Sequence, residues 1–215
     1  ISLKLAGFSI ILTIVFGVGS GVLMAVKKDR LLDHVLGTFS TVALSVPGFW
    51  IAIVLIFIFA EQWKILPSSG ISDGSGFILP AITLALPSIG VCARLTRSAI
   101  LDEIGRQYMT VADAKGMSRR RAVIRHAFGN ALIPIITYLG NHMAGIIGGA
   151  SIVETIFAIP GIGSYAIAGV QSKDYYVVQA YVLFSGCIYV LTNILIDLIY
   201  IALDPKIRAG EAVES

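Results

Sequence analysis

The chain has 215 residues, of which 56% are hydrophobic and only 13% carry a charge, and its formal net charge is +3. Soluble domains carry about 25% charged residues. This deficit, together with a mean hydropathy of +0.86, excludes an ordinary soluble domain and indicates a membrane protein.

Five apolar stretches approach or exceed the roughly 20 residues that a membrane-spanning helix needs. In chain order they cover residues 5–26, 35–60, 77–93, 131–153 and 177–203. The first begins almost at once, without the charged segment or cleavage site of a signal peptide before it. No segment between the stretches has the composition of a soluble domain. We therefore predict an all-α protein, a polytopic helical bundle of about five spans that forms a single transmembrane domain over residues 1–215.

Prolines interrupt two of these stretches. Pro47 lies within the second stretch, and Pro80 and Pro87 lie within the third. A proline leaves one backbone carbonyl of its helix without a donor, and in a membrane this carbonyl needs a partner from a neighbouring helix or from water. The prolines are open to two interpretations: packing kinks, or helices shaped around a pathway. The two cysteines, Cys92 and Cys187, also lie in apolar stretches, where we interpret them as small packing residues.

The basic residues predict the orientation of the chain. When residues 27–30 are assigned to the cytoplasm and the spans alternate from there, only Lys4, Lys64 and Lys173 of the 16 Lys and Arg residues fall outside. Lys and Arg resist translocation, so the side that holds most of them is the cytoplasm. We therefore predict a multi-pass protein with a cytoplasmic C-terminus.

Two segments between the spans differ in character. Residues 154–176 are too short and too broken, by Pro160 and Gly161, to cross the membrane, so we expect them to lie at the outer face or to re-enter. Residues 94–128 form a cytoplasmic loop. In this loop Gly116 suits the end of one short helix and Ser118 suits the N-cap of the next, which predicts two helices joined by a sharp turn.

The basic residues of this loop allow three interpretations. They could fix the topology or touch anionic lipid. Nucleic-acid binding is disfavoured, because no aromatic residues are interleaved with the arginines. The third interpretation is a docking element for a cytoplasmic partner, and the small residues at a tight turn favour it.

Three motifs resemble those of a known family. They are YMTVADAKGMSRRRAVIRHAFGNALIP at 108–134, GGASIVETIFAIPGIG at 148–163 and NILIDLIYIALDPKIR at 193–208. Together they are similar to the membrane permeases of ABC importers, in the branch that transports dipeptides, oligopeptides or nickel. The resemblance covers nearly the whole chain. Permeases of this family begin with a further span and an external region, so we expect that first span to precede this chain.

The resemblance implies a fold, a function and partners. The fold is that of a type I importer permease, in the cytoplasmic membrane of a bacterium or archaeon, and the chain forms half of the translocation pathway. The implied partners are two ATP-binding subunits, a second homologous permease and an extracytoplasmic substrate-binding protein. The two permeases are expected to form a heterodimer. ATP and Mg are expected on the ATP-binding subunits, since the chain has no Gly-x-x-x-x-Gly-Lys-[Ser/Thr] motif of its own. The implied contact with the ATPases comprises Ala112, Asp113, Ala114, Lys115, Gly116, Met117, Ser118 and Arg119.

Asn141 and His142 are the candidates for the pathway. Polar groups inside a span are costly, and these two lie mid-span in a stretch rich in glycine and alanine. His142 is either a hydrogen-bonded histidine of the bundle or a pathway group that meets a peptide carboxylate or a nickel chelate. We expect no catalytic residue and no metal site, because the sequence has no nucleophile–base arrangement and no ligand cluster. A secondary transporter and a polytopic membrane enzyme are the weaker alternatives, the first because no inverted repeat is visible.

Overall fold

The computed structural model describes residues 1–71, 74–106 and 127–203. Every regular element within these ranges is a helix, which confirms the predicted all-α class. The helices in chain order are α1 (Ser2–Leu12), η1 (Thr13–Val18), α2 (Gly19–Val26), α3 (Leu31–Ser45), α4 (Gly48–Leu55), η2 (Ile56–Gln62), η3 (Ser75–Phe77), α5 (Ile78–Ile104), α8 (Phe128–Gly149), α9 (Ser151–Ile156), α10 (Ile162–Gln171) and α11 (Tyr175–Leu203).

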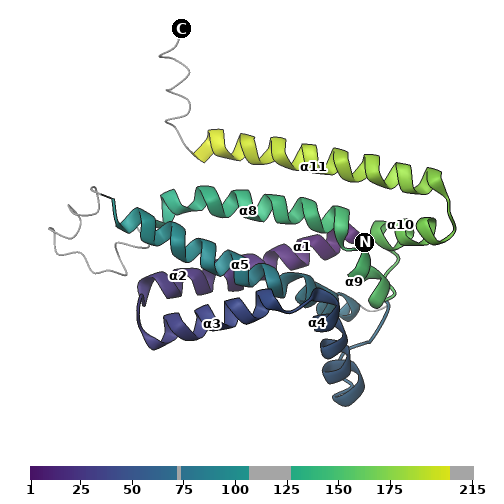
Figure 1. Cartoon of the computed structure of the whole chain (residues 1–215), viewed down its shortest axis with the longest axis horizontal. Coiled ribbons are helices and arrows are strands. Elements are labelled where there is room, and N and C mark those ends of the chain that lie inside the picture. The colour runs from purple at the N-terminus through teal and green to yellow at the C-terminus, as the bar shows by residue number, and fades with distance from the viewer. Residues whose placement is uncertain (72–73, 107–126, 204–215) are drawn as a thin grey trace, which may run out of the picture.

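The long helices lie side by side, with their connections at two ends (Figure 1). One end holds the α2–α3 turn, the last residues of α5 and the first residues of α8. The other end holds α9, α10 and the start of α1. We call the first the α2–α3 end and the second the α9–α10 end.

Three helical stretches of the described chain are long and apolar enough to cross a membrane: Ser2–Val26, Ser75–Ile104 and Tyr175–Ile199. The pair α3 and α4 makes a fourth if it counts as one span. The remaining predicted stretch, 131–153, is represented by α8, a 22-residue helix that packs against α5 and α11 without meeting these criteria over its described residues.

The second predicted span is not one straight helix. It divides into α3 and α4, whose axes differ by 102°. The break lies at Pro47, and both Val46 and Pro47 have extended backbone, with ψ angles of 125° and 138°. The proline ring disfavours helical geometry in the residue before it, so Val46 leaves the helix. The predicted kink is therefore a sharp corner, and α4 leaves the bundle there (Figure 1).

Helix α5 is the centre of the bundle, and glycines allow its neighbours to approach closely. It packs against α1, η1, α2, α3, α4 and α8. A Cβ atom at Gly21 would lie 2.5 Å from Thr96 Cβ and 2.6 Å from the Ala93 carbonyl oxygen, and one at Gly90 would lie 2.6 Å from the Ser40 carbonyl oxygen. In a membrane such close packing between helices, rather than the hydrophobic effect, drives their association.

This contact predicts an unequal effect for two neighbouring glycines. Gly21→Ala should destabilise the protein by about 1–3 kcal/mol, the usual cost of overpacking, because the new methyl group overlaps α5. Gly19→Ala is the matched control, since a Cβ at Gly19 meets no atom within 4 Å. The measurement is the thermal melting midpoint of the detergent-purified protein. Equal midpoints for the two variants would contradict the close packing of α2 on α5.

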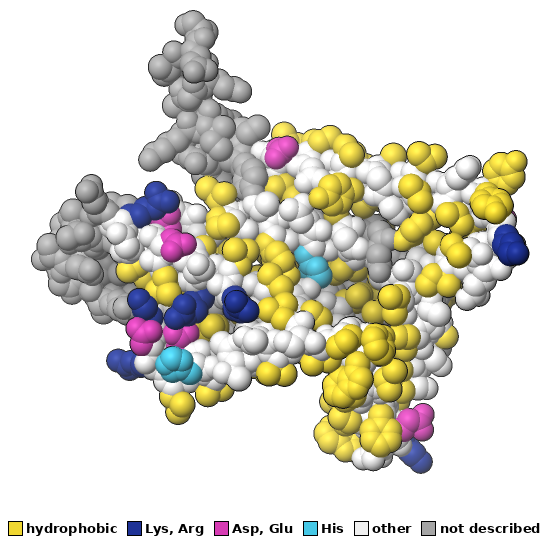
Figure 2. Space-filling view, in the orientation of Figure 1, with side chains coloured by type: hydrophobic (Ala, Val, Ile, Leu, Met, Phe, Trp, Pro, Cys, Tyr) yellow, Lys and Arg dark blue, Asp and Glu magenta, His cyan; other side chains and the backbone are white. Residues whose placement is uncertain are grey.

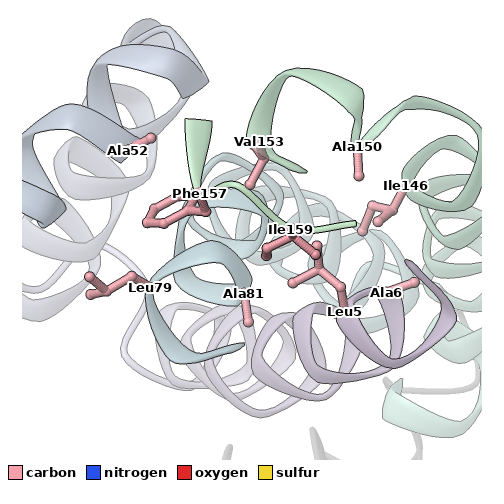
Figure 3. Packing of buried hydrophobic residues seen from close by; sticks show 10 residues of the cluster. All are labelled: Leu5, Ala6, Ala52, Leu79, Ala81, Ile146, Ala150, Val153, Phe157 and Ile159. Carbon is pink, nitrogen blue, oxygen red and sulfur yellow. The ribbon is translucent and has the colours of Figure 1, made fainter. Parts of the chain in front are cut away.

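A hydrophobic core fixes the α9–α10 end (Figure 3). Phe157, at the end of α9, is 1% exposed and lies in one cluster with Leu5, Leu79, Ile146 and Ile159. These residues come from α1, α5, α8 and the segment after α9, so the cluster joins elements that are distant in sequence. Residues 154–176 thus include the end of α9, all of α10 and the start of α11, and the two short helices α9 and α10 are too short to cross a membrane.

Candidate functional site

A polar group lies between α5 and α8, among otherwise apolar helices. Tyr138 and His142 are four residues apart on α8, so their rings lie on one face of the helix. The rings stack, with centroids 5.9 Å apart and planes 3° from parallel. The Tyr138 hydroxyl donates to the Ser88 carbonyl oxygen at 3.3 Å, and the Ser88 hydroxyl lies 3.2 Å from His142 Nδ1. Ser88 of α5 therefore holds both rings.

His142 keeps one unused hydrogen-bonding function in either neutral tautomer. If the Ser88 hydroxyl donates to the Leu84 carbonyl oxygen, 3.3 Å away, the Nδ1–H of His142 donates to Ser88, and Nε2 is an open acceptor. If Ser88 donates to Nδ1 instead, the Nε2–H is an open donor. Nε2 is buried and has no partner among the described residues. The histidine thus fits the first interpretation, a hydrogen-bonded bundle histidine, and still has a free group for a further contact.

Asn141 does not join this group. Successive residues of an α-helix point about 100° apart, since a turn takes 3.6 residues. His142 is partly buried against α5, whereas Asn141 is exposed. The structure therefore separates the two pathway candidates.

The residues implied for ATPase contact, 112–119, lie outside the described residues, which end at Arg106 and resume at Ala127. Within the predicted cytoplasmic segment 94–128, α5 continues as a helix to Ile104. The two ends of the intervening segment are nevertheless joined. Asn130 Nδ2 donates to Glu103 Oε2 at 3.1 Å, and Arg106 Nε lies 2.8 Å from Glu103 Oε1.

A second charged contact joins α5 to α3 at the same end. Arg97 donates to both carboxylate oxygens of Asp33, from Nε at 2.7 Å and from a terminal nitrogen at 2.8 Å. Asp33 is 4% exposed, and its Oδ2 also accepts the backbone N–H of Asp29 at 2.9 Å. Asp29 has a left-handed backbone, with φ of 61°, in the turn between α2 and α3. The pair thus fixes this turn on α5.

The pair also borders a cleft of about 900 Å³ between α3 and α5, which His34 and Arg94 line as well. Basic and acidic side chains gather at this end of the molecule (Figure 2). The predicted concentration of charge on one side of the bundle is therefore visible on the folded surface.

At the α9–α10 end, sequence reasoning missed a buried carboxylate. Glu154 is 0% exposed. It accepts the Ser2 hydroxyl at 2.6 Å and the Ser164 backbone N–H, at the start of α10, at 2.9 Å. The Ser2 hydroxyl oxygen in turn accepts the N–H of Ile162 at 2.9 Å. Glu154 therefore connects α9, α10 and α1. The signal in the sequence is an acidic residue shortly before a Pro–Gly helix start, where backbone N–H groups need an acceptor.

The chain matches a known protein family over most of its length. Residues 17–209 match the family described as the binding-protein-dependent transport system inner membrane component. The chain belongs to this family. It is a permease component of an ABC importer, and it has the apolar helices of a multi-pass membrane protein.

Curated relatives of this permease cover nearly its whole length. It is 38% identical to a probable peptide ABC transporter permease of Sinorhizobium fredii, over 96% of this chain and 69% of the relative. It is 34% identical to the dipeptide transport system permease of Bacillus subtilis, over 97% of this chain and 68% of the relative. It is also 34% identical to the glutathione transport system permease of Escherichia coli, over 93% of this chain and 65% of the relative. All three relatives are transport permeases, none of them named for nickel.

Solved structures share the fold of the permease. A chain of the inward-facing MetNI methionine ABC transporter superposes with a TM-score of 0.76 at 17% identity, covering 94% of this permease and 93% of that chain. A chain of an amino acid ABC transporter solved with histidines gives a TM-score of 0.73 at 18% identity, covering 92% and 88%. The predicted type I importer permease fold is therefore confirmed.

Proposed function

We propose that the permease forms half of the translocation pathway of an ATP-driven importer of dipeptides or oligopeptides. The observation that carries this proposal is the identity of 34–38%, over almost the whole chain, to permeases named for peptides, dipeptides and glutathione. A peptide substrate is favoured over nickel, because the three relatives above are named for peptides, dipeptides and glutathione, and the described residues contain no group of three or more potential metal ligands. A secondary transporter or a membrane enzyme is not favoured by the family match.

The proposed assembly has four kinds of subunit: this permease, a second homologous permease, two ATP-binding subunits and an extracytoplasmic binding protein. ATP and Mg bind to the ATP-binding subunits, where hydrolysis takes place. Helix α11 leaves a surface on which a second permease could pack, because only 11% of its apolar membrane-length window is buried within this chain. An exposed apolar helix of this kind requires lipid or another membrane subunit around it.

Within the permease we propose residues 1–215 as one transmembrane domain and residues 94–128 as its coupling loop. The contact with an ATPase is proposed at residues 112–119, on the strength of the sequence motif. His142 and Asn141 remain the proposed pathway residues. Support for His142 comes from its buried, unused Nε2, and support for Asn141 comes from its exposure on α8.

The proposed orientation places the α2–α3 end and the C-terminus in the cytoplasm. Single cysteines at Lys28 and Lys173, both exposed and at opposite ends, test it in a background where Cys92 and Cys187 are replaced by alanine. In intact cells a membrane-impermeant maleimide should label position 173 and leave position 28 unlabelled until the cells are opened. Labelling of position 28 in intact cells, with position 173 protected, would show that the topology is the opposite of the one proposed.

Uptake by whole cells tests the substrate class. A strain that lacks the permease should lose uptake of radiolabelled dialanine and regain it when the gene is restored, while uptake of radioactive nickel should not change. In the same assay His142→Ala should raise the apparent KM for dialanine. Loss of nickel uptake with normal dialanine uptake would overturn the peptide assignment.

A further inference from the structure

Among the described residues, a polar contact joins the end of α5 to the start of α8. Glu103 lies in the last turn of α5 and Asn130 in the first turn of α8, 27 residues apart in sequence, and their side chains meet at 3.1 Å. Arg106 binds the other oxygen of the same carboxylate at 2.8 Å. Both carboxylate oxygens are thus occupied, one by each side of the segment.

The surroundings of Glu103 are closely packed. Its residue is 8% exposed, whereas its neighbour Asp102 is exposed. A small cluster of residues that are at most 1% exposed lies at the same end of the bundle: Ala25 of α2, Ile100 of α5, and Ala127 and Ala131 at the start of α8. Three of these four are alanines, so the helix backbones approach closely and leave little room to move against one another.

Burying a carboxylate between helices is energetically unfavourable. Removing its charge from water costs free energy, and an apolar pair of similar size often stabilises a fold equally well or better. A hydrogen-bonded carboxylate adds geometric specificity, because it can accept the hydrogen bond from Asn130 in only one register of α5 against α8. The contact therefore holds the relative position of the two helix ends.

We propose that Glu103 is a positioning residue for transport: it joins the two ends of the coupling segment, so that a movement imposed on that segment reaches α5 and α8 together. This inference rests on the proposed function, in which the ATPases act on the segment between these ends. The Asp33–Arg97 pair then carries the movement of α5 to α3. Without the Glu103–Asn130 contact, ATP hydrolysis would continue, but fewer substrate molecules would be transported for each ATP hydrolysed.

The test uses the complete importer in lipid vesicles, and it measures dialanine transported per ATP hydrolysed. Asn130→Asp sets two carboxylates against each other, and Glu103→Gln/Asn130→Asp restores a donor and an acceptor with their roles exchanged. We expect Asn130→Asp to lower the ratio at least about 5-fold, the lower end of typical coupling between sites, and the double variant to recover it. Asp102→Asn, the same loss of charge one residue away at an exposed position, should leave the ratio unchanged.

Three outcomes would overturn the inference. The ratio could stay at the unsubstituted value in Asn130→Asp, or the double variant could fail to recover it. Alternatively, both Asn130→Asp and Glu103→Gln could fail to assemble while Asp102→Asn assembles, which would make the contact purely structural. Failure of the proposed function is distinguishable, because then the unsubstituted permease itself would not co-purify with ATPases or transport dialanine.

Discussion

Replacing Gly116 with valine is expected to abolish uptake while the protein still inserts into the membrane. Gly116 lies outside the described residues, and the prediction rests on its place between the small residues of the motif and the N-cap Ser118. A left-handed backbone at a helix end costs a residue other than glycine about 1 kcal/mol or more, and a β-branched side chain there would also crowd the proposed contact with the ATPase. No apolar stretch is altered, so insertion should be normal.

The measurement for Gly116→Val is dialanine uptake together with the amount of ATPase that co-purifies. A triple substitution of Arg119, Arg120 and Arg121 by glutamine is the comparison, and it should have a smaller effect because exposed charges each contribute little. Normal uptake by Gly116→Val, with both ATPases bound, would place the coupling element elsewhere in the chain.

Gly161→Ala is expected to have the largest effect on stability. A Cβ atom at Gly161 would overlap the buried carboxylate of Glu154 and displace it. The hydroxyl of Ser2 and the N–H of Ser164 would then lose their acceptor, and each buried group left unpaired costs about 1–3 kcal/mol. The α9–α10 end should therefore separate from α1.

The thermal melting midpoint of purified Gly161→Ala measures this effect. Gly145→Ala is the matched control, because a Cβ at Gly145 meets no atom within 4 Å. Glu154→Ala should behave like Gly161→Ala, since it removes the same acceptor. If both variants have the same melting midpoint as the Gly145→Ala control, the Glu154 contacts do not stabilise this end.

The positions of most helices could be predicted from the sequence, because apolar length alone determines where a chain can cross a membrane. The predicted first stretch, residues 5–26, corresponds to the observed span Ser2–Val26, and the predicted last stretch corresponds to α11. The second span shows the limit. Its hydropathy is continuous from 35 to 60, and only the geometry of Pro47 turns one predicted helix into two at 102°. A proline can kink or break a helix, and hydropathy does not distinguish the two.

The polar contacts were less predictable, because their partners are far apart in the sequence. His142 was recognisable as costly within a span, but its partner Ser88 is 54 residues away. The Asp33–Arg97 pair spans 64 residues and the Ser2–Glu154 contact spans 152. Each buried acid signals that a partner exists. Only the packing of α1, α3, α5 and α9 identifies which residue that partner is.

Transport by purified components tests whether the permease belongs to an ATP-driven peptide importer. The complete importer is placed in vesicles that enclose ATP and Mg, with the binding protein and radiolabelled dialanine outside. We expect dialanine to accumulate inside only when both enclosed ATP and the binding protein are present. Accumulation without ATP, driven by an ion gradient alone, would show that the permease is not part of an ATP-driven importer.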